Sequence, residues 1–407
     1  MIASLSPEQN FILSCVRRAL NGTCPLEVEP TLDWERIASL ATQHGVVALV
    51  HSALNATSTV VPEQIRTRLR AGYLAAVLQT KASLEPSLNQ VVTALHGSGL
   101  EPVVLKGAAL AYTAYPEPFF RSMADVDLLL PAEQLGQASK VLLEMGFVTN
   151  AQQVEPEHHL RSHYPPSGRL GFELHRDLLP ESSPYRIDVR RLRERSRVAR
   201  LGSVNVPVLS PADAVFLTCV HLAYTHRYGR YPLRSLTDIL AITSFHADCL
   251  DWDGLIRETL ASRASGAVYW PLKFAREWLG AAVPPSVLSR LAPPIPSRWL
   301  ISADIEPSAL FNGDGRSEQS DTVLLNLLRE LSLFTGCPVG VQVGSIVRSI
   351  FPPPNAVGHL PTSMTHSHLR YALYLANPFR LIRGLIALGR LLAKLPMHQD
   401  VPRSVSR

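Results

Sequence analysis

The stretch of sequence that most constrains the fold runs from Glu101 to Pro131 and reads EPVVLKGAALAYTAYPEPFFRSMADVDLLLP. Its apolar run 102–105 ends at Lys106-Gly107 and is followed by small helix-forming residues, which predicts a strand, a tight turn and a helix. Glycine lets backbone N–H groups approach a ligand closely, and the first turn of a helix directs free N–H groups at an anion. The turn is therefore predicted to bind a phosphate.

Two acidic residues, Asp125 and Asp127, alternate with apolar residues in the run DVDLLL of the same stretch. Side chains alternate across a strand, so the two carboxylates are expected to share one face. The apolar neighbours indicate that this strand lies in the core. Two adjacent carboxylates repel each other by roughly 1 to 4 kcal/mol at ~4 Å, and a bound divalent cation would turn that repulsion into attraction.

A third acidic residue stands in the segment LGFELHRDLL, where Glu173 and His175 are expected to share a face of a neighbouring strand. Three carboxylates from two strands suit Mg²⁺, because this ion prefers oxygen ligands and is usually shared between carboxylates and substrate phosphates. The sequence therefore predicts a magnesium site beside the phosphate-binding turn.

This order of motifs resembles the nucleotidyltransferase superfamily that is built on the DNA polymerase β core. The segments LKGAAL, FRSMADVDLLL and FELHRDL are most similar to a bacterial family of uncharacterised nucleotidyltransferases, and more distantly to nucleotidyltransferase toxins of abortive-infection systems. The close resemblance covers roughly the middle third of the chain. Where the superfamily usually has Gly-Gly or Gly-Ser, this chain has Gly107-Ala108, so phosphate binding would rest on backbone N–H groups and Lys106.

The resemblance implies an α+β fold, in which a small mixed β-sheet core is flanked by helical N- and C-terminal regions. It implies a Mg²⁺-dependent transfer of a nucleoside monophosphate from a nucleoside triphosphate to an acceptor hydroxyl. The catalytic and metal-binding residues would be Asp125, Asp127 and Glu173, and the nucleotide would be bound by Lys106, Gly107, Arg121 and Asp238.

Three of these nucleotide-binding assignments have structural alternatives. Arg121 is equally well explained by an ion pair with one of the acidic residues. Asp238 stands four residues after Arg234 on a predicted helix, a spacing typical of a surface ion pair. Lys106 is also explained by a side chain that extends to solvent from the end of a strand and contacts no ligand.

Four regions are expected along the chain. Residues 1–98 are predicted to be helical, 99–208 to form the nucleotidyltransferase core, 209–283 to form helices that pack on the cleft, and 284–407 to form a peripheral extension with amphipathic helices. Individual helices are predicted at 62–79, 83–97, 131–145, 211–223 and 321–335. A further one at 371–395 has a basic face that would pack on the protein or contact an acidic membrane surface peripherally.

Two clusters of basic side chains, one of histidines and one of arginines, are predicted to be solvated. His158, His159 and His163 lie in a polar, proline-rich segment without a fourth ligand nearby, so they are predicted to be solvated loop residues and not zinc ligands. The arginine-rich run 186–200 contains acidic residues as well, which is typical of a solvated face, with a phosphate or RNA contact as the alternative.

Composition narrows the function classes. With 46% apolar and 18% charged residues the chain is globular, and no uncharged apolar run is long enough for a transmembrane segment. Five widely spaced cysteines without a C-x-x-C pair indicate a reducing, cytoplasmic setting. The net charge of +5 mildly favours acidic substrates such as nucleotides.

The sequence leaves the acceptor open. A small molecule or peptide would fit a tailoring enzyme of natural-product biosynthesis, whereas tRNA or a protein would fit a toxin-like transferase. A catalytically inactive nucleotide-binding module is the alternative outside enzymes.

Overall fold

The structure is a computed structural model, and it describes residues 5–22, 26, 31–57, 59–150, 155–166, 170–226, 228, 232–293 and 337. All of them belong to one compact unit, Met1–Gly315 with Ser332–Cys337. The predicted helices 321–335 and 371–395, and nearly all of the predicted peripheral extension, lie outside the described residues.

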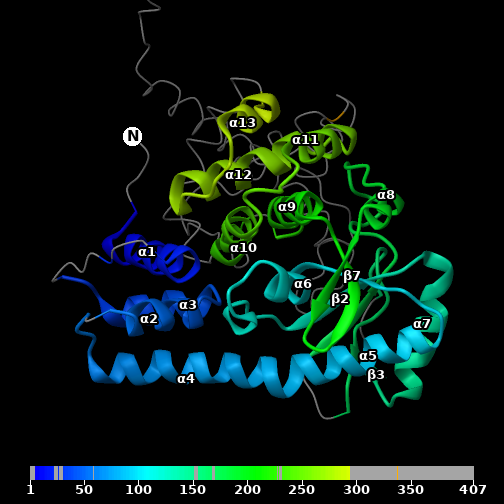
Figure 1. Cartoon of the computed structure of the whole chain (residues 1–407), viewed down its shortest axis with the longest axis horizontal. Coiled ribbons are helices and arrows are strands. Elements are labelled where there is room, and N and C mark those ends of the chain that lie inside the picture. The colour runs from blue at the N-terminus through cyan, green and yellow to red at the C-terminus, as the bar shows by residue number, and fades with distance from the viewer. Residues whose placement is uncertain are drawn as a thin grey trace, which may run out of the picture. The chain divides into compact units, whose positions relative to one another are not determined.

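A mixed sheet forms the centre of this unit, with its strands in the order β3-β4-β5-β2-β1-β7-β6 (Figure 1). The strands are β1 (Val103–Val104), β2 (Asp125–Leu129), β3 (Val148–Thr149), β4 (His163–Tyr164), β5 (Gly171–His175), β6 (Arg197–Leu201) and β7 (Val204–Val208). β2 pairs with β1 in antiparallel and with β5 in parallel orientation. The predicted class, α+β with a mixed sheet and flanking helices, is confirmed.

The alternation of side chains along β2 gives the sheet two different faces. Val126 and Leu128 lie in a core cluster with Phe172 and with side chains of helices α5 (Glu85–Gly97) and α7 (Leu135–Glu144). On the opposite face, Leu129 joins an apolar cluster with side chains of α8 (Val189–Glu194) and α9 (Pro211–Val220). The two acidic residues of β2 alternate with Val126 and Leu128, so they point toward this second face.

A long helical segment runs beneath the sheet in the view of Figure 1. It consists of α4 (Glu63–Gln79), a π-helical turn (Thr80–Leu84) and α5. The sequence predicted two separate helices here, which is wrong at their junction. Pro86 cannot donate a backbone hydrogen bond to the preceding turn, and the π-helical turn that comes just before it lets the helix continue past this proline.

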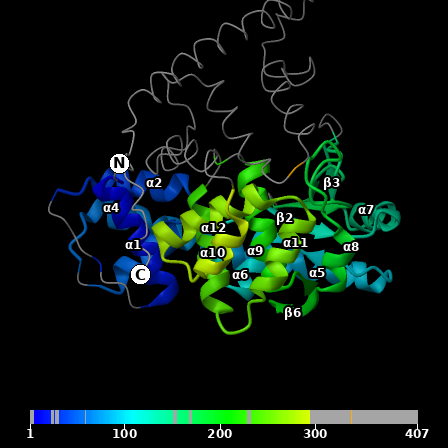
Figure 2. The same cartoon turned by 90° about the horizontal axis from the view of Figure 1, so that it is seen from above.

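Three shorter helices precede this segment: α1 (Pro7–Asn21), α2 (Trp34–Gln43) and α3 (Val47–Asn55). Figures 1 and 2 both show α1, α2 and α4 at one end of the unit and α7 and β3 at the other. Between α2 and α3 the backbone turns at Gly45, where φ is 67° and a Cβ would lie 2.5 Å from Ser122 Oγ. Only glycine fits this turn, which brings the N-terminal helices against the loop before β2.

The helices after the sheet pack on its second face and on one another. They are α9, a π-helical turn (His221–Thr225), α10 (Pro232–Phe245), α11 (Trp252–Ala261), α12 (Ser265–Leu279) and α13 (Pro285–Leu291) (Figure 2). Ser210 caps α9 by accepting a hydrogen bond from the Asp213 N–H at 3.2 Å, as its sequence predicts. None of the described helices is long and apolar enough to cross a membrane.

Two helices are also found within the core region. α6 (Lys106–Thr113) follows β1 directly, and α7 follows a short 3₁₀ turn (Ala132–Gln134). The predicted helix 131–145 is thus confirmed apart from its first turn, and Gly146 ends it with a φ of 86°.

Candidate functional site

A cavity of about 820 Å³ opens where three parts of the fold meet. One wall comes from the turn between α2 and α3 and from α4, a second from the N-terminus of α6 and the ends of β2 and β5, and a third from α9 and α10. Lys106, Gly107, Arg121, Asp125, Glu173 and Asp238, all singled out from the sequence, line this cavity. His221, His226 and Arg234 line it as well.

The three acidic residues are brought together by strand register. β2 and β5 run in parallel, with Asp127 directly opposite Glu173 and Leu129 opposite His175. Paired residues of neighbouring strands point to the same face, so Asp127 and Glu173 lie side by side with Asp125 one residue pair away. The register therefore places the three side chains on one face of the sheet, where Asp125 and Glu173 line the cavity and Asp127 is not among its lining residues.

Asp127 is 3% exposed and does not line the cavity, but it is bound by two side chains that do, Lys106 and His175. Lys106 Nζ donates to Asp127 Oδ1 at 2.9 Å, and His175 Nε2 lies 2.8 Å from the same oxygen. Burial alone would raise the pKa of Asp127, but Lys106 and His175 hold this pKa well below its usual range. The repulsion expected between the two aspartates is therefore offset at Asp127 by the protein itself.

The same contacts shift the pKa values of the partners. Burial opposes the charged form of Lys106, yet the Asp127 carboxylate outweighs it and raises the pKa of this lysine. For His175, burial is likewise outweighed by the hydrogen bonds to Asp127 and Glu173, which raise its pKa above 6.5. The acidic residues thus favour the charged form of both side chains.

Asp125 is the acidic residue exposed to the cavity, and no hydrogen-bond or ion-pair partner is described for it. Enclosure by the protein and the negative charges of Asp127 and Glu173 raise its pKa. Asp125, Asp127 and Glu173 face two permanent cations, Lys106 and the more remote Arg234, so negative charge exceeds positive charge when His175 is neutral. Such a site stabilises an added cation.

The junction of β1 and α6 differs from the predicted glycine turn. The left-handed backbone conformation falls on Lys106, with a φ of 47°, whereas Gly107 lies inside the first turn of α6. A left-handed non-glycine residue is strained by ~1–3 kcal/mol, which the Lys106–Asp127 ion pair helps to offset. Lys106 does not extend to solvent, so that alternative is wrong: its side chain is 20% exposed and paired with Asp127.

Gly107 is needed for packing and not for a turn. A Cβ at this position would lie 3.2 Å from Arg121 Nη1 and 3.4 Å from Arg121 Cζ, so the guanidinium sits directly against the backbone of α6. No side chain caps the N-terminus of α6. Its first N–H groups therefore remain suited to an anion, as the sequence predicted.

Arg121 and Asp238 form a buried ion pair with each other. Arg121 donates from Nε to Asp238 Oδ1 at 2.7 Å and from Nη2 to Oδ2 at 2.9 Å, and Tyr115 Oη donates to Oδ1 at 2.6 Å. Two sequence alternatives are corrected here. The acidic partner of Arg121 is Asp238 and not one of the β2 or β5 acidic residues, and Asp238 is only 2% exposed, so it does not belong to a surface ion pair.

The interpretation of the histidines as solvated loop residues is wrong for two of the three. His159 and His163 are 7% and 1% exposed, because the segment that carries them pairs with β5 and becomes part of the sheet. His159 pairs with His175 in a β-bridge, which places its ring beside Glu173. His163 instead bonds Ser139 Oγ through Nε2.

His159, Glu173 and His175 could together hold a metal ion, since one ligand atom from each lies within 4.8 Å of the others. Glu173 Oε2 is 3.8 Å from His159 Nε2 and 3.4 Å from His175 Nε2. Ser162 Oγ donates to the other oxygen, Oε1, at 3.0 Å. Sequence reasoning missed His159 and Ser162, because the pairing of their segment with β5 has no local signal.

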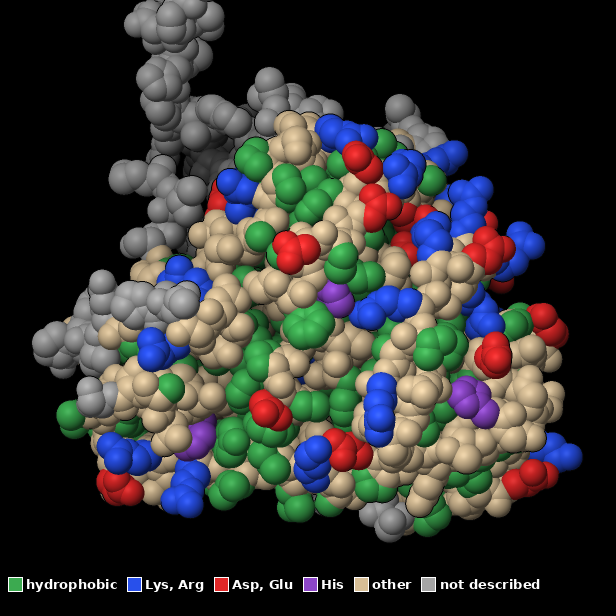
Figure 3. Space-filling view, viewed as in Figure 1, with side chains coloured by type: hydrophobic (Ala, Val, Ile, Leu, Met, Phe, Trp, Pro, Cys, Tyr) green, Lys and Arg blue, Asp and Glu red, His purple; other side chains and the backbone are tan. Residues whose placement is uncertain are grey.

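The arginine-rich run 186–200 is only partly solvated. Arg190 and Arg191 are exposed beside Asp188, as expected. Arg195, however, donates to Asp213 Oδ1 and Glu258 Oε2 at 2.7 Å each, which joins the run to α9 and α11. On the face shown in Figure 3, basic and acidic side chains are interspersed and form no large patch of one sign.

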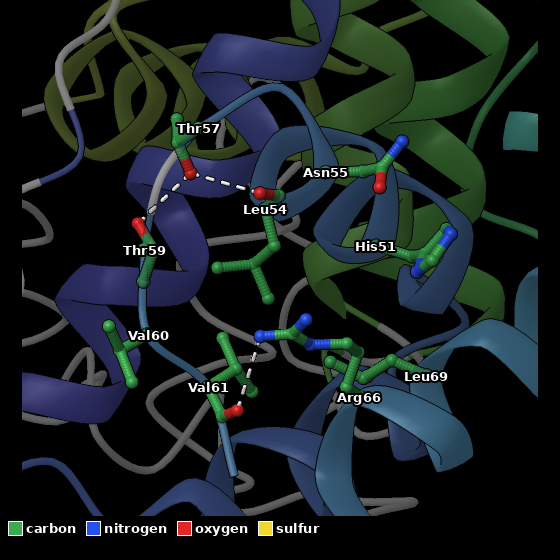
Figure 4. Close-up of a pocket in the computed structure, with 9 residues that line it drawn as sticks. All are labelled: His51, Leu54, Asn55, Thr57, Thr59, Val60, Val61, Arg66 and Leu69. Atoms are coloured by element: carbon green, nitrogen blue, oxygen red, sulfur yellow. Dashed lines mark hydrogen bonds between the residues drawn. The ribbon is translucent and has the colours of Figure 1, made fainter. Parts of the chain in front are cut away.

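A second cavity, of about 310 Å³, lies between α3 and α4 and contains no acidic residue (Figure 4). Its arginine, Arg66, points its guanidinium at the Val61 carbonyl oxygen, and its histidine, His51, stacks on Tyr73 outside the cavity. None of the catalytic, metal-binding or nucleotide-binding residues expected from the sequence lines this second cavity.

Comparison with protein families gives one match. The family model described as "Uncharacterised nucleotidyltransferase" matches residues 30–280, which include the whole sheet and every wall of the larger cavity. Comparison with curated proteins and with solved structures found no match.

Proposed function

Since the chain belongs to the uncharacterised nucleotidyltransferase family, we propose that it transfers a nucleoside monophosphate from a nucleoside triphosphate to an acceptor hydroxyl. The acceptor oxygen forms a bond to the α-phosphorus, the bond from this phosphorus to the β-phosphate oxygen breaks, and pyrophosphate leaves. The observation that carries the proposal is the position of Asp125 and Glu173 in one cavity with the uncapped N-terminus of α6.

Asp125 and Asp127 are the residues that we propose to hold Mg²⁺. Their oxygens are the ligand type this ion prefers, and the excess negative charge around Asp125 supports a divalent cation there. When bound, the ion supplies charge neutralisation for the triphosphate. Lys106 and His175 hold Asp127 ionised and in a fixed orientation for this role.

Glu173 is proposed to act at the attacking oxygen, where it helps to remove the proton of the acceptor hydroxyl. Its hydrogen bond from Ser162 orients the carboxylate toward the cavity side of β5. Burial opposes its ionisation, but the His175 hydrogen bond lowers its pKa, so that it is an anion ready to accept a proton or bind a cation.

The N-terminus of α6 is proposed to bind the outer phosphates of the nucleotide through its free N–H groups, next to Gly107 and Lys106. Lys106 sits between this helix end and the acidic residues, where its charge can be shared with the leaving pyrophosphate. The charged atoms of Arg121 and Asp238 form hydrogen bonds with each other. We therefore propose that these residues hold Gly107 and α10 in position and do not bind the nucleotide.

The acceptor stays a prediction: a small molecule or peptide in a tailoring pathway, or tRNA or a protein for a toxin-like transferase. The boundaries of the four regions, the cytoplasmic location and a peripheral membrane contact by 371–395 also stay predictions. The interspersed charges in Figure 3 give no support to a broad nucleic-acid-binding surface on that face.

The proposal is tested by incubating the protein with Mg²⁺ and each nucleoside triphosphate labelled at the α-phosphate, and following pyrophosphate release and transfer of label to candidate acceptors. Asp125→Asn is expected to abolish Mg²⁺-dependent release. Asp248→Asn is the matched control, because Asp248 is exposed in the loop after α10 and outside the cavity. Equal release by both variants would remove Asp125 from the mechanism.

A further inference from the structure

We infer that His159, Glu173 and His175 form a second metal site beside the proposed magnesium site, and that this second site takes a divalent transition-metal ion. Ligands around a tetrahedral ion with bonds of about 2.0–2.1 Å lie about 3.4 Å apart. Glu173 Oε2 already lies 3.4 Å from His175 Nε2 and 3.8 Å from His159 Nε2. Small side-chain rotations would complete the coordination.

Hydrogen bonds prepare both imidazoles for coordination through Nε2. His159 Nδ1 contacts the Leu160 carbonyl oxygen at 2.6 Å, and His175 Nδ1 contacts the Asp177 carbonyl oxygen at 3.3 Å. A carbonyl oxygen only accepts hydrogen bonds, so each Nδ1 carries a proton. In the metal-free chain His175 Nε2 is also protonated and donates to Asp127 Oδ1, so an ion binds His175 in place of this proton, and the neutral ring then offers its Nε2 lone pair to the ion. Histidines that bind a metal through one ring nitrogen typically donate such a hydrogen bond from the other.

Glu173 is oriented in the same way. Ser162, which is 3% exposed, holds Oε1 at 3.0 Å and leaves Oε2 directed at the two histidines. The three donor atoms thus come from two adjacent segments, each fixed by its backbone pairing: β5 for Glu173 and His175, and the β-bridge for His159.

The donor set decides the class of ion. Two imidazole nitrogens and one carboxylate suit Zn²⁺, Co²⁺, Mn²⁺ or Fe²⁺, whereas Mg²⁺ prefers oxygen ligands only. Three protein ligands facing a cavity also leave coordination positions open to a substrate oxygen, as in catalytic zinc sites. Because His175 Nε2 donates to Asp127 Oδ1 at 2.8 Å in the metal-free chain, an ion at this site would replace that hydrogen bond, while Lys106 still binds Asp127.

The inference rests on the proposed function only for what the second ion would do, namely bind the attacking oxygen. Metal binding itself needs no nucleotide and no acceptor. It can therefore be measured whether or not the chain transfers nucleotides.

The experiment uses the full chain without a histidine tag, stripped of metal by a chelator and titrated with Co²⁺ by calorimetry and visible absorption. We expect one Co²⁺ per chain with the strong absorption of a four- or five-coordinate ion, displaced by Zn²⁺ but not by excess Mg²⁺. His159→Asn is expected to remove this binding, whereas His96→Asn, the matched control at an exposed position of α5 outside the cavity, retains it.

Two further variants separate the second site from its surroundings. Ser162→Ala removes only the support of Glu173, and we expect Co²⁺ affinity to fall about ten- to hundred-fold. Asp125→Asn is expected to keep Co²⁺ binding although transfer is lost. Circular dichroism melting of each variant shows that it is folded.

The outcomes distinguish the two proposals. Displacement of Co²⁺ by Mg²⁺, or equal Co²⁺ binding by the His159 and His96 variants, would overturn the second metal site and show that the histidines only hydrogen-bond the acidic residues. A chain that binds Co²⁺ through His159 but transfers no nucleotide would retain the metal site and refute the transferase.

Discussion

Replacing Arg121 by methionine should destabilise the fold strongly, because it removes the guanidinium that pairs with a buried carboxylate. Asp238 is 2% exposed and receives two hydrogen bonds from the guanidinium, at 2.7 and 2.9 Å, across 117 residues of sequence. Removing one partner of a buried ion pair typically costs about 3–5 kcal/mol. Tyr115 still donates to Asp238 in the variant, which favours the lower half of that range.

The double variant Arg121→Met/Asp238→Leu shows whether the loss of stability comes from leaving the buried Asp238 carboxylate without Arg121. Replacing a whole buried ion pair by apolar residues is often neutral or stabilising. The double variant should therefore be at least about 2 kcal/mol more stable than Arg121→Met alone, and the four stabilities together give the coupling energy between the two residues.

The free energy of unfolding is measured by urea denaturation followed by circular dichroism, for the wild type, both single variants and the double variant. Arg290→Met serves as the matched control, since Arg290 and Asp253 form an ion pair with side chains 52% and 67% exposed, expected to contribute less than about 1 kcal/mol. If Arg121→Met cost no more than this control, the buried pair would not hold α10 on the core.

Three other outcomes are expected from the same site. Lys106→Ala should weaken nucleoside triphosphate binding about ten- to hundred-fold and monophosphate binding less, because one charge-assisted contact is worth about 1.5–3 kcal/mol. Both affinities are measured by calorimetric titration, and equal losses of affinity for the two ligands would contradict this role. The pKa of His175 is raised above 6.5, so the stability that its charged form contributes is fully present below that pH and is lost as the pH rises through the folded-state pKa. With a chelator present, the free energy of unfolding of His175→Asn should therefore fall less between pH 6 and 9 than that of the wild type. Parallel pH profiles would count against the Asp127–His175 pair. Gly107→Ala should lower the midpoint of thermal unfolding, because the alanine Cβ would lie 3.2 Å from the Arg121 guanidinium and Asp238 holds that guanidinium in place. An unchanged midpoint would show that this packing is loose.

Local patterns in the sequence were sufficient to predict several elements of the fold. The alternation in DVDLLL predicted β2 and the shared face of Asp125 and Asp127, since side-chain direction in a strand follows from its period of two. The Ser210 cap and Gly146 terminus were predicted for the same reason: their hydrogen bonds and dihedral angles involve neighbours within a few residues. Such features need no knowledge of the rest of the chain.

The sequence could not predict which distant groups would satisfy the charges of the site. Lys106, assigned to phosphate, binds Asp127, and Arg121 binds Asp238 from α10. Sequence spacing does not determine which charged groups form pairs. A buried charge is stabilised by an opposite charge nearby, and only the packing of helices on the sheet decides which charge that is.

His159 shows the same limit most clearly. Its surroundings in the sequence are polar and rich in proline, and a solvated loop was the natural prediction. Backbone pairing with His175 instead buries its ring beside Glu173. The sequence by itself determined the acidic residues and the strands that carry them, whereas the strand pairing, a property of the whole sheet, decided that histidines complete the site.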